Sequence, residues 1–492
     1  MSNRSTETYN DGSKARVGRR AAGRKGLLSA GVALAALAAG TGPGAAQTSL
    51  ADAMVRAYNS NPGLAADRAG LRALDEDEVQ ARSGRLGELT GQATYGLRSA
   101  DGGRFRTGTS RDDTDPVSLG VGGSIPIYDG GQIENASEAA ESGVLAGRQD
   151  LIATEQSVLL DAVTAFEDVR RDIGLVGVAR SNVRVISEQL RAAQDRFEVG
   201  EVTRTDVSQA EARLAAARSQ LAATTGSLAQ SRQAYLLAVG ELPDDLQPPP
   251  PLPQLPATEA AALALAEAQH PTLQSARFQA RQAGFNVKRT IGQTLPRLDA
   301  EVDASYSNSD VFLNGGGGNG ESNSVSLGLR GTIPLWTGGD NPSQVRESQA
   351  RLAQAQAVVQ DVGRQIRQAV SNSWSGLEVA RISITAAREQ IRAAQIAFDG
   401  VREEATLGAR TTLDVLDADQ ELQNARADLI IALRDEYVAG YSLLSAVGSL
   451  TVDHLGLQVR PYDVDASRER VRRDRFGYDR DESTQWSERW RP

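Results

Sequence analysis

The chain has 492 residues and a formal net charge of −10, with no cysteine and two histidines. Without cysteine it can form no disulfide, thiolate metal site or cysteine nucleophile, and His270 and His454 lie too far apart in sequence for a histidine-rich metal motif. A chain this acidic is also a poor nucleic-acid binder.

Residues 1–46 have the features of a secretory signal peptide. Seven basic and two acidic side chains lie there, so the remaining chain carries about −15 (−10 minus +5). Basic residues precede a small and apolar run at 26–39, and Gly44-Ala45-Ala46 permits cleavage before Gln47. The run is too short to span a bilayer. Arg19-Arg20 leaves a twin-arginine signal as an alternative, although no cofactor motif downstream calls for export of a folded protein.

The rest of the chain is a tandem duplication. Asn61-Pro62-Gly63-Leu64 recurs as His270-Pro271-Thr272-Leu273, and Ile125-Pro126-Ile127-Tyr128 recurs as Ile333-Pro334-Leu335-Trp336. Such internal repeats determine the domain organisation. The predicted parts are a first repeat at 47–246, a stiff, proline-rich linker at 247–256 and a second repeat at 257–459.

Residues 460–492 form the last predicted part. They are dense in Arg, Asp, Glu and Ser, a composition that buries too little apolar surface to fold alone. We therefore expect a mostly disordered tail, in which Trp486 and Trp490 have no assigned role.

Each repeat is predicted to begin with a helix, at about 49–86 and 258–295, followed by two strands. The strands are expected at 89–98, 117–127, 298–308 and 325–335, with long polar loops at 99–116 and 309–323. In the third strand Leu298, Ala300 and Val302 share one face, and the acids Asp299, Glu301 and Asp303 share the other. Such alternation over the length needed to cross a bilayer is typical of a membrane β-barrel, although a half-buried soluble sheet alternates too.

A very long helix follows each strand pair, at 132–199 and 344–407. No proline interrupts either stretch, and some 65 residues make a rod of roughly 100 Å. Apolar residues recur every seven positions, which indicates supercoiling against a neighbouring helix. A further helix of about 40 residues is expected to fold back antiparallel along each rod.

Glycine breaks separate these paired helices, at Gly200 and Gly408. After Gly408 the helix restarts with Thr411 or Thr412 as N-cap, and Asp414 and Asp417 then share one face. For either copy alone, the simplest interpretation is a capped helix start whose acids favour the positive end of the helix dipole.

Four strands cannot close a membrane barrel, because the smallest barrels use about eight. Open strand edges in lipid would leave backbone groups unpaired, so several chains must pool their strands. Two chains would give a barrel that side chains nearly fill, whereas three leave room for water. The acidic face of Asp299, Glu301 and Asp303 needs water, which favours three chains and a lumen lined by these acids.

At this point the sequence resembles the TolC family of outer-membrane efflux and secretion channels, over about residues 48–457. The resemblance lies in Ile125-Pro126-Ile127-Tyr128-Asp129-Gly130-Gly131, in its copy at 333–339, in the two glycine-break phrases and in the ending at 441–450. It implies an α+β membrane protein with four strands per chain, a 12-stranded barrel shared by a homotrimer in outer-membrane lipid, and a 12-helix barrel of coiled-coil helices in the periplasm of a Gram-negative bacterium. It also implies docking with a periplasmic adaptor and an inner-membrane pump or ABC exporter.

The resemblance assigns roles to individual residues. It implies that Asp414 and Asp417 form cation-binding rings at the pore aperture, and that Arg410 ties the closed tip to Asp206 of a neighbouring chain. A tyrosine often found three residues before the second glycine is Ala405 in this sequence, which thins that network. Pro126 and Pro334 mark the strand-to-helix junctions.

Other classes of protein fit the sequence less well. No nucleophile–base set, phosphate loop or metal cluster is visible, so we expect no enzyme, cofactor or bound metal. The main alternative is a periplasmic coiled-coil adaptor or structural protein without a pore, but such a rod has no use for alternating strand pairs. The cargo, drugs or secreted proteins, is left open.

Overall fold

The computed structural model describes residues 48–102, 110–311 and 318–473. The chain divides into two units, Met1–Ala45 and Ala46–Pro492, and the fold is that of the second. The predicted signal peptide lies outside the described residues. Among the helices that are described, none has both the length and the hydrophobicity needed to cross a bilayer.

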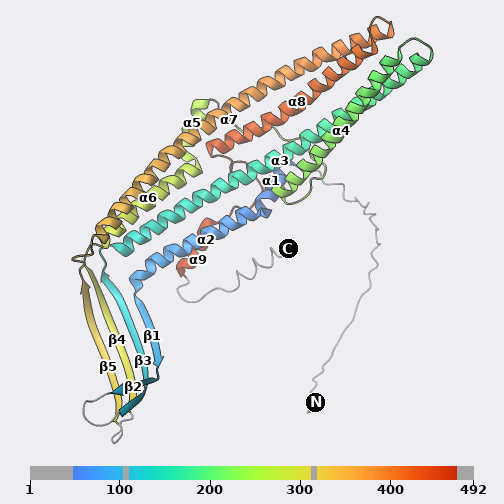
Figure 1. The fold of residues 1–492 in the computed structure, drawn as a ribbon. Helices are drawn as coiled ribbons and strands as arrows, with labels where there is room; N and C mark the ends of the chain where they lie inside the picture. Colours follow the sequence, from blue (N-terminus) through green and yellow to red (C-terminus); the bar gives the residue numbers. More distant parts are fainter. Residues whose placement is uncertain (1–47, 103–109, 312–317, 474–492) are drawn as a thin grey trace, which may run out of the picture. The chain divides into compact units, whose positions relative to one another are not determined.

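The two repeats contain matching helices and long strands in the same order, and the first repeat adds a 3-10 turn and the short strand β2 (Figure 1). The first comprises α1 (Leu50–Ser60), α2 (Pro62–Ser83), a 3-10 turn (Gly84–Leu86), β1 (Glu88–Tyr95), β2 (Arg98–Gly102), β3 (Ser110–Tyr128), α3 (Gln132–Glu198) and α4 (Arg204–Val239). The second comprises α5 (Glu259–Gln269), α6 (Pro271–Gly292), β4 (Arg297–Val311), β5 (Gly318–Thr332), α7 (Asp340–Thr406) and α8 (Thr412–Val447). A last helix, α9 (Val464–Arg473), follows.

The prediction of one helix at the start of each repeat is wrong, because both break before a proline. Asn61 and His270 have extended backbones, with ψ of 120° and 122°. A residue that precedes proline is driven out of the helical region by the proline ring. Each then caps the next helix, with Asn61 Oδ1 accepting from the amide of Leu64 at 3.1 Å and His270 Nδ1 from that of Thr272 at 3.2 Å.

The strands form one antiparallel sheet in the order β1-β3-β4-β5, with β2 extending the β1 side of β3. The register places apolar residues opposite one another on one face, as in the pairs Leu119 with Tyr306 and Val302 with Leu327. Serine, glycine and charged residues fill the other face. The loops predicted at 99–116 and 309–323 are shorter than expected, because β2 and β3 extend into the first and β4 and β5 into the second.

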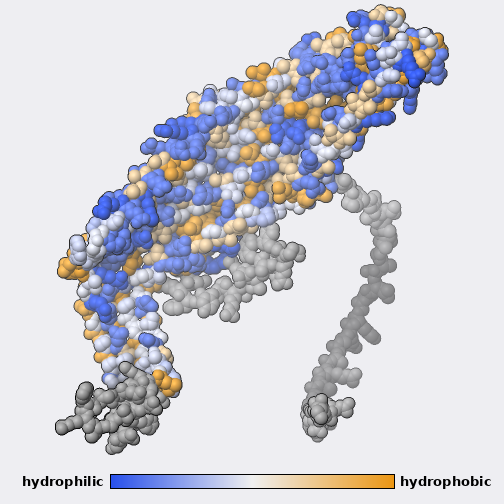
Figure 2. Space-filling model, in the orientation of Figure 1, coloured by the Kyte–Doolittle hydropathy of each residue, from blue (hydrophilic) through white to orange (hydrophobic). Residues whose placement is uncertain are grey.

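The long helices carry the chain away from the sheet. α3 and α7 contain 67 residues each, which corresponds to about 100 Å. α4 lies along α3, and α8 lies along α7 (Figure 1). The main core cluster lies partway along them, where Leu159 and Phe166 of α3 pack with Tyr235 of α4 and Leu444 of α8. On the face in view in Figure 2, hydrophilic and hydrophobic side chains are interspersed along these helices.

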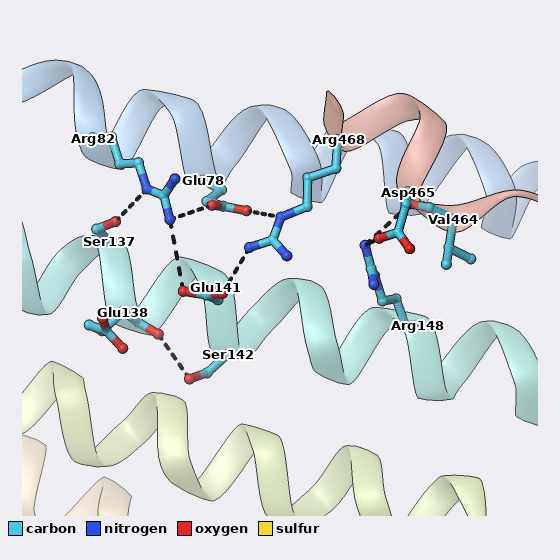
Figure 3. Close-up of polar contacts among 10 residues, drawn as sticks. All are labelled: Glu78, Arg82, Ser137, Glu138, Glu141, Ser142, Arg148, Val464, Asp465 and Arg468. Atoms are coloured by element: carbon cyan, nitrogen blue, oxygen red, sulfur yellow. Dashed lines mark hydrogen bonds and ion pairs between the residues drawn. The ribbon is translucent and has the colours of Figure 1, made fainter. Parts of the chain in front are cut away.

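The prediction of disorder after Arg460 is wrong for residues 464–473, which form α9. Arg468 donates from Nε to Glu78 of α2 at 2.8 Å and from Nη2 to Glu141 of α3 at 2.9 Å (Figure 3). Glu78 is only 2 % exposed and also pairs with Arg82 at 2.7 Å. Composition suggested a segment that could not fold alone, and these ion pairs show that it folds against α2 and α3 instead. Trp486 and Trp490 lie outside the described residues.

Arg468→Ala is expected to loosen α9. Removing one of the guanidinium partners of the buried Glu78 carboxylate should cost about 1–3 kcal/mol, because hydrogen bonds to charged groups contribute that much. Amide exchange of α9, measured by mass spectrometry on the purified protein in detergent, should therefore accelerate about tenfold or more. Arg351→Ala removes an exposed pair with Glu347 on α7 and should leave α9 exchange unchanged. Equal amide exchange of α9 in the two variants would contradict a stabilising role of the Arg468 ion pairs.

Candidate functional site

The two loops that end the long helices have the same backbone geometry. Gly200 and Gly408 have φ of 80° and 77°, a left-handed conformation that side chains with a Cβ rarely adopt. The following amides close each helix end, with Glu201 N donating to Arg196 O and Ala409 N to Glu404 O, both at 2.9 Å. Each glycine therefore both ends one helix and allows the chain to reverse.

A capping box then starts each returning helix. Thr411 Oγ1 accepts from the amide of Asp414 at 3.2 Å, and Asp414 Oδ2 accepts from the amide of Thr411 at 3.0 Å. Thr203 and Asp206 make the same pair of bonds at the start of α4. The backbone hydrogen bond from the threonine lowers the pKa of Asp414 and of Asp206. Both carboxylates are therefore ionised at neutral pH.

Arg410 lies between Gly408 and this capping box. Its Nε donates to Glu404, in the last turn of α7, at 2.8 Å. The hydrogen bond to Glu404, followed by the charges of Glu404 and Asp414, raises the pKa of Arg410. The predicted contact between Arg410 and Asp206 joins two neighbouring chains. A single chain does not test it, so it stays a prediction.

Asp417 has a partner that the sequence analysis missed. Arg213 of α4 donates from Nη2 to Asp417 Oδ1 at 2.7 Å, which joins α4 to α8. The buried pair Leu214 and Leu416 packs in the cluster nearest to these helix starts and brings the two charged neighbours together. Helical periodicity predicts which residues of one helix share a face. It does not predict which residues of a second helix, about 200 positions away in the sequence, that face contacts. Asp417 therefore has an ion-pair partner within its own chain, whereas Asp414 makes its hydrogen bonds to neutral capping groups and is influenced only at longer range by the charge of Arg410.

The acids of β4 lie on the polar face of the sheet. Asp299 accepts from Arg297 Nε at 2.8 Å, and Glu301 accepts from Arg330 Nε of β5 at 2.8 Å. Asp303 Oδ1 lies 2.8 Å from the position that a Cβ of Gly122 would occupy, so this glycine leaves room for the acid. Arginines thus offset two of the three predicted lumen-facing charges.

The strand-to-helix junctions are compact turns. Pro126 lies near the end of β3, where the pairing with β4 shifts register. Pro334 follows the end of β5. Asp129 caps α3 by accepting from the amides of Gly131 at 2.9 Å and Ile133 at 2.6 Å. No group of three or more metal-ligating residues occurs within the described parts of the chain.

A sheet with one apolar and one polar face, continued by two 67-residue helices that each pair with a 36-residue helix, is the architecture of an outer-membrane channel-tunnel protein. The family model for outer membrane efflux proteins matches residues 53–241 and 262–449. The chain belongs to this family, whose members are channels and not enzymes. It is an outer-membrane protein whose helical part lies in the periplasm.

Individual relatives agree with this assignment. The chain is 38 % identical to the outer membrane efflux protein BepC of Brucella suis, over 91 % of this chain and 96 % of the relative. It is 28 % identical to the outer membrane protein TolC of Escherichia coli, over 80 % and 81 % of the two chains. The outer membrane channel CmeC of Campylobacter jejuni has the same fold, with a TM-score of 0.73 at 16 % identity over 86 % of this chain and 89 % of that one. The predicted TolC-family membership and fold class are confirmed.

Proposed function

We propose that three copies of this chain assemble into a passive exit duct for efflux, type I secretion or both. One observation carries the proposal: in the described residues, β1 and β5 have no strand on their outer sides. In a bilayer those edges would leave backbone groups unpaired at several kcal/mol each, so β1 of one copy pairs with β5 of the next. Three copies give twelve strands, enough to enclose water. The polar face then lines the lumen.

The helices extend this duct across the periplasm. Rods of about 100 Å are far longer than a diffusion pore requires. They support docking with a periplasmic adaptor and with an inner-membrane pump or ABC exporter. The alternative is a periplasmic coiled-coil protein without a pore. The exposed apolar face of the sheet, where Val325 and Leu327 are more than 80 % accessible, favours contact with lipid and therefore the channel.

The helix-end loops form the proposed gate at the periplasmic tip. Three copies of Asp414 and Asp417 place carboxylates around one axis, and such rings favour cations and can bind multivalent ions. Arg410 holds the closed state by a contact with Asp206 of a neighbouring copy. An exposed pair of this kind contributes at most about 1 kcal/mol, so closure depends on three pairs acting together.

Disulfide trapping tests the assembly, since the chain has no cysteine of its own. Gln92→Cys on β1 is combined with one cysteine on β5, scanned over Ser322, Ser324 and Ser326 on the same face of the sheet. At the matching register we expect a non-reducing gel ladder that ends at three copies. Gln92→Cys alone is the control. A ladder that ends elsewhere, or none at any position, would refute the trimeric barrel.

Arg410→Ala is expected to make the channel leakier, because it removes the proposed link between neighbouring tips. Single-channel recording in planar bilayers should show a higher open fraction. Glu404→Gln is the matched control. It removes the ion-pair partner of Arg410 within the chain but keeps the positive charge of Arg410, so the channel should stay closed. Equal conductance in Arg410→Ala and the wild type would rule out the latch.

Block by a trivalent cation tests the proposed rings. The double variant Asp414→Ala/Asp417→Ala should lose the block in planar bilayers. Of the single variants, Asp414→Ala should lose more, because Arg213 already offsets the charge of Asp417. Asp361→Ala, on the exposed surface of α7, should keep the block. Block that persists in the double variant would place the binding site elsewhere.

A further inference from the structure

A pocket rich in arginine lies at the start of α9, where this helix packs along α2 (Figure 1). Its volume is about 380 Å³. Arg68 and Arg72 line it from α2, and Arg460 and Arg470 line it from the segment that follows α8. Asp463 is the one acidic residue in the described lining, so the pocket carries three more positive than negative charges (four minus one). Like charges held this close repel one another, and a bound anion relieves that repulsion.

The acid in the lining already has a structural role. Asp463 Oδ1 accepts from the amides of Asp465 and Ala466, at 3.0 Å and 3.1 Å, and so caps the start of α9. Arg72 and Arg470 also interact with other residues. A guanidinium group has five N–H donors, however, and can hold more than one partner at a time. The pocket therefore keeps donors and positive charge that a ligand can use.

Arg68 is held in place by two aromatic rings. Its guanidinium carbon lies 4.6 Å from the ring centre of Tyr58 and 5.5 Å from that of Tyr462. Glu155 of α3 offsets part of its charge from a distance. Its Nη2 makes a long hydrogen bond of 3.5 Å to the carbonyl oxygen of Tyr58, and its buried Nε has no hydrogen-bond partner in the part of the chain that the structure describes. Because a buried donor without an acceptor costs free energy, this guanidinium is suited to an acceptor from outside the chain.

From these observations we propose that the pocket binds an oxyanion, a phosphate or carboxylate group, and that the bound anion joins α2 to α9. Guanidinium groups hold such anions through two parallel hydrogen bonds. Arg68 and Arg72 are half-buried and form the inner part of the site, whereas Arg460 and Arg470 are exposed and form its rim. Because the arginines come from two segments, a ligand that contacts both stabilises the packing of α9 on α2. The site lies within one chain, so neither the trimer nor the gate is needed for it.

The position of the pocket favours a soluble anion over a lipid headgroup. Arg72 lies 11 residues before the end of α2 at Ser83, which is about 16 Å along the helix from the side of the sheet. The helical part of this outer-membrane protein lies in the periplasm, so a soluble phosphate or carboxylate reaches the pocket without crossing lipid.

Amide exchange of α9, measured by mass spectrometry on the full-length protein in detergent, tests this site. Inorganic phosphate and citrate are each compared with chloride at equal ionic strength, so that general screening is the same. We expect either oxyanion to slow the exchange of α9 at least about threefold, because a ligand of the folded form reduces opening by a factor of one plus the ratio of its concentration to Kd. The double variant Arg460→Gln/Arg470→Gln changes only exposed residues and should abolish the slowing. Arg351→Gln, the matched control, removes an exposed arginine of α7 and should keep it.

A lipid arm of the experiment distinguishes the source of the anion. Detergent micelles that contain phosphatidylglycerol are compared with micelles of neutral detergent alone, in chloride. Slowing by phosphatidylglycerol but not by the soluble anions would support the site and assign it to a lipid headgroup. Equal α9 exchange under all of these conditions would overturn the proposal. Slowing that persists in Arg460→Gln/Arg470→Gln would overturn it too, because the anion would then act outside this pocket.

Discussion

Backbone hydrogen bonding in lipid is the constraint on which the rest of this structure depends. The four-stranded path of the sheet satisfies β3 and β4 on both sides and leaves β1 and β5 each with one open side. A soluble protein could leave such edges in water, but hydrocarbon offers no partner for them. This demand for closure is the physical basis of the proposed assembly, in which several copies share one barrel. The duplication gives each chain two copies of the same arrangement of strands, helices and turns, one in each repeat.

Patterns with a short period were sufficient to predict much of this fold. The alternation in Leu298–Asp303 predicted the two faces of β4, and the seven-residue period of the long helices predicted that they pair. Both predictions succeeded because the spacing of apolar residues within one strand or helix shows which of its faces is buried. The threonines after Gly408 predicted an N-cap at Thr411 or Thr412, and Thr411 is the cap in the structure. The breaks at Asn61 and His270 were also visible in the sequence, because each residue precedes a proline, but these positions served only as evidence of the duplication.

Contacts between distant segments could not be predicted in this way. The pairing of Arg213 with Asp417 depends on how α4 and α8 rotate against the buried Leu214 and Leu416. The order of α9 depends on Glu78, a carboxylate that looks like one more surface charge until Arg82 and Arg468 enclose it. Composition indicates whether a segment can fold alone, and it carries no information about the contacts that α9 makes with α2 and α3. Asp414 shows a related ambiguity, because the carboxylate that closes the capping box is also the one proposed to contribute to a pore ring.

The junction between sheet and helices has a mechanical consequence. A Cβ on Gly130 would lie 2.6 Å from the carbonyl oxygen of Gly292, so the end of α6 and the turn that precedes α3 are in close backbone contact at this point. From there each rod extends for about 100 Å, and a rigid rod of that length converts a rotation of one degree at its base into a displacement of about 2 Å at its far end. A small change in packing at the junction would therefore be amplified along the helices. A rotation too small to disturb the sheet would displace the far helix ends by about the diameter of an ion.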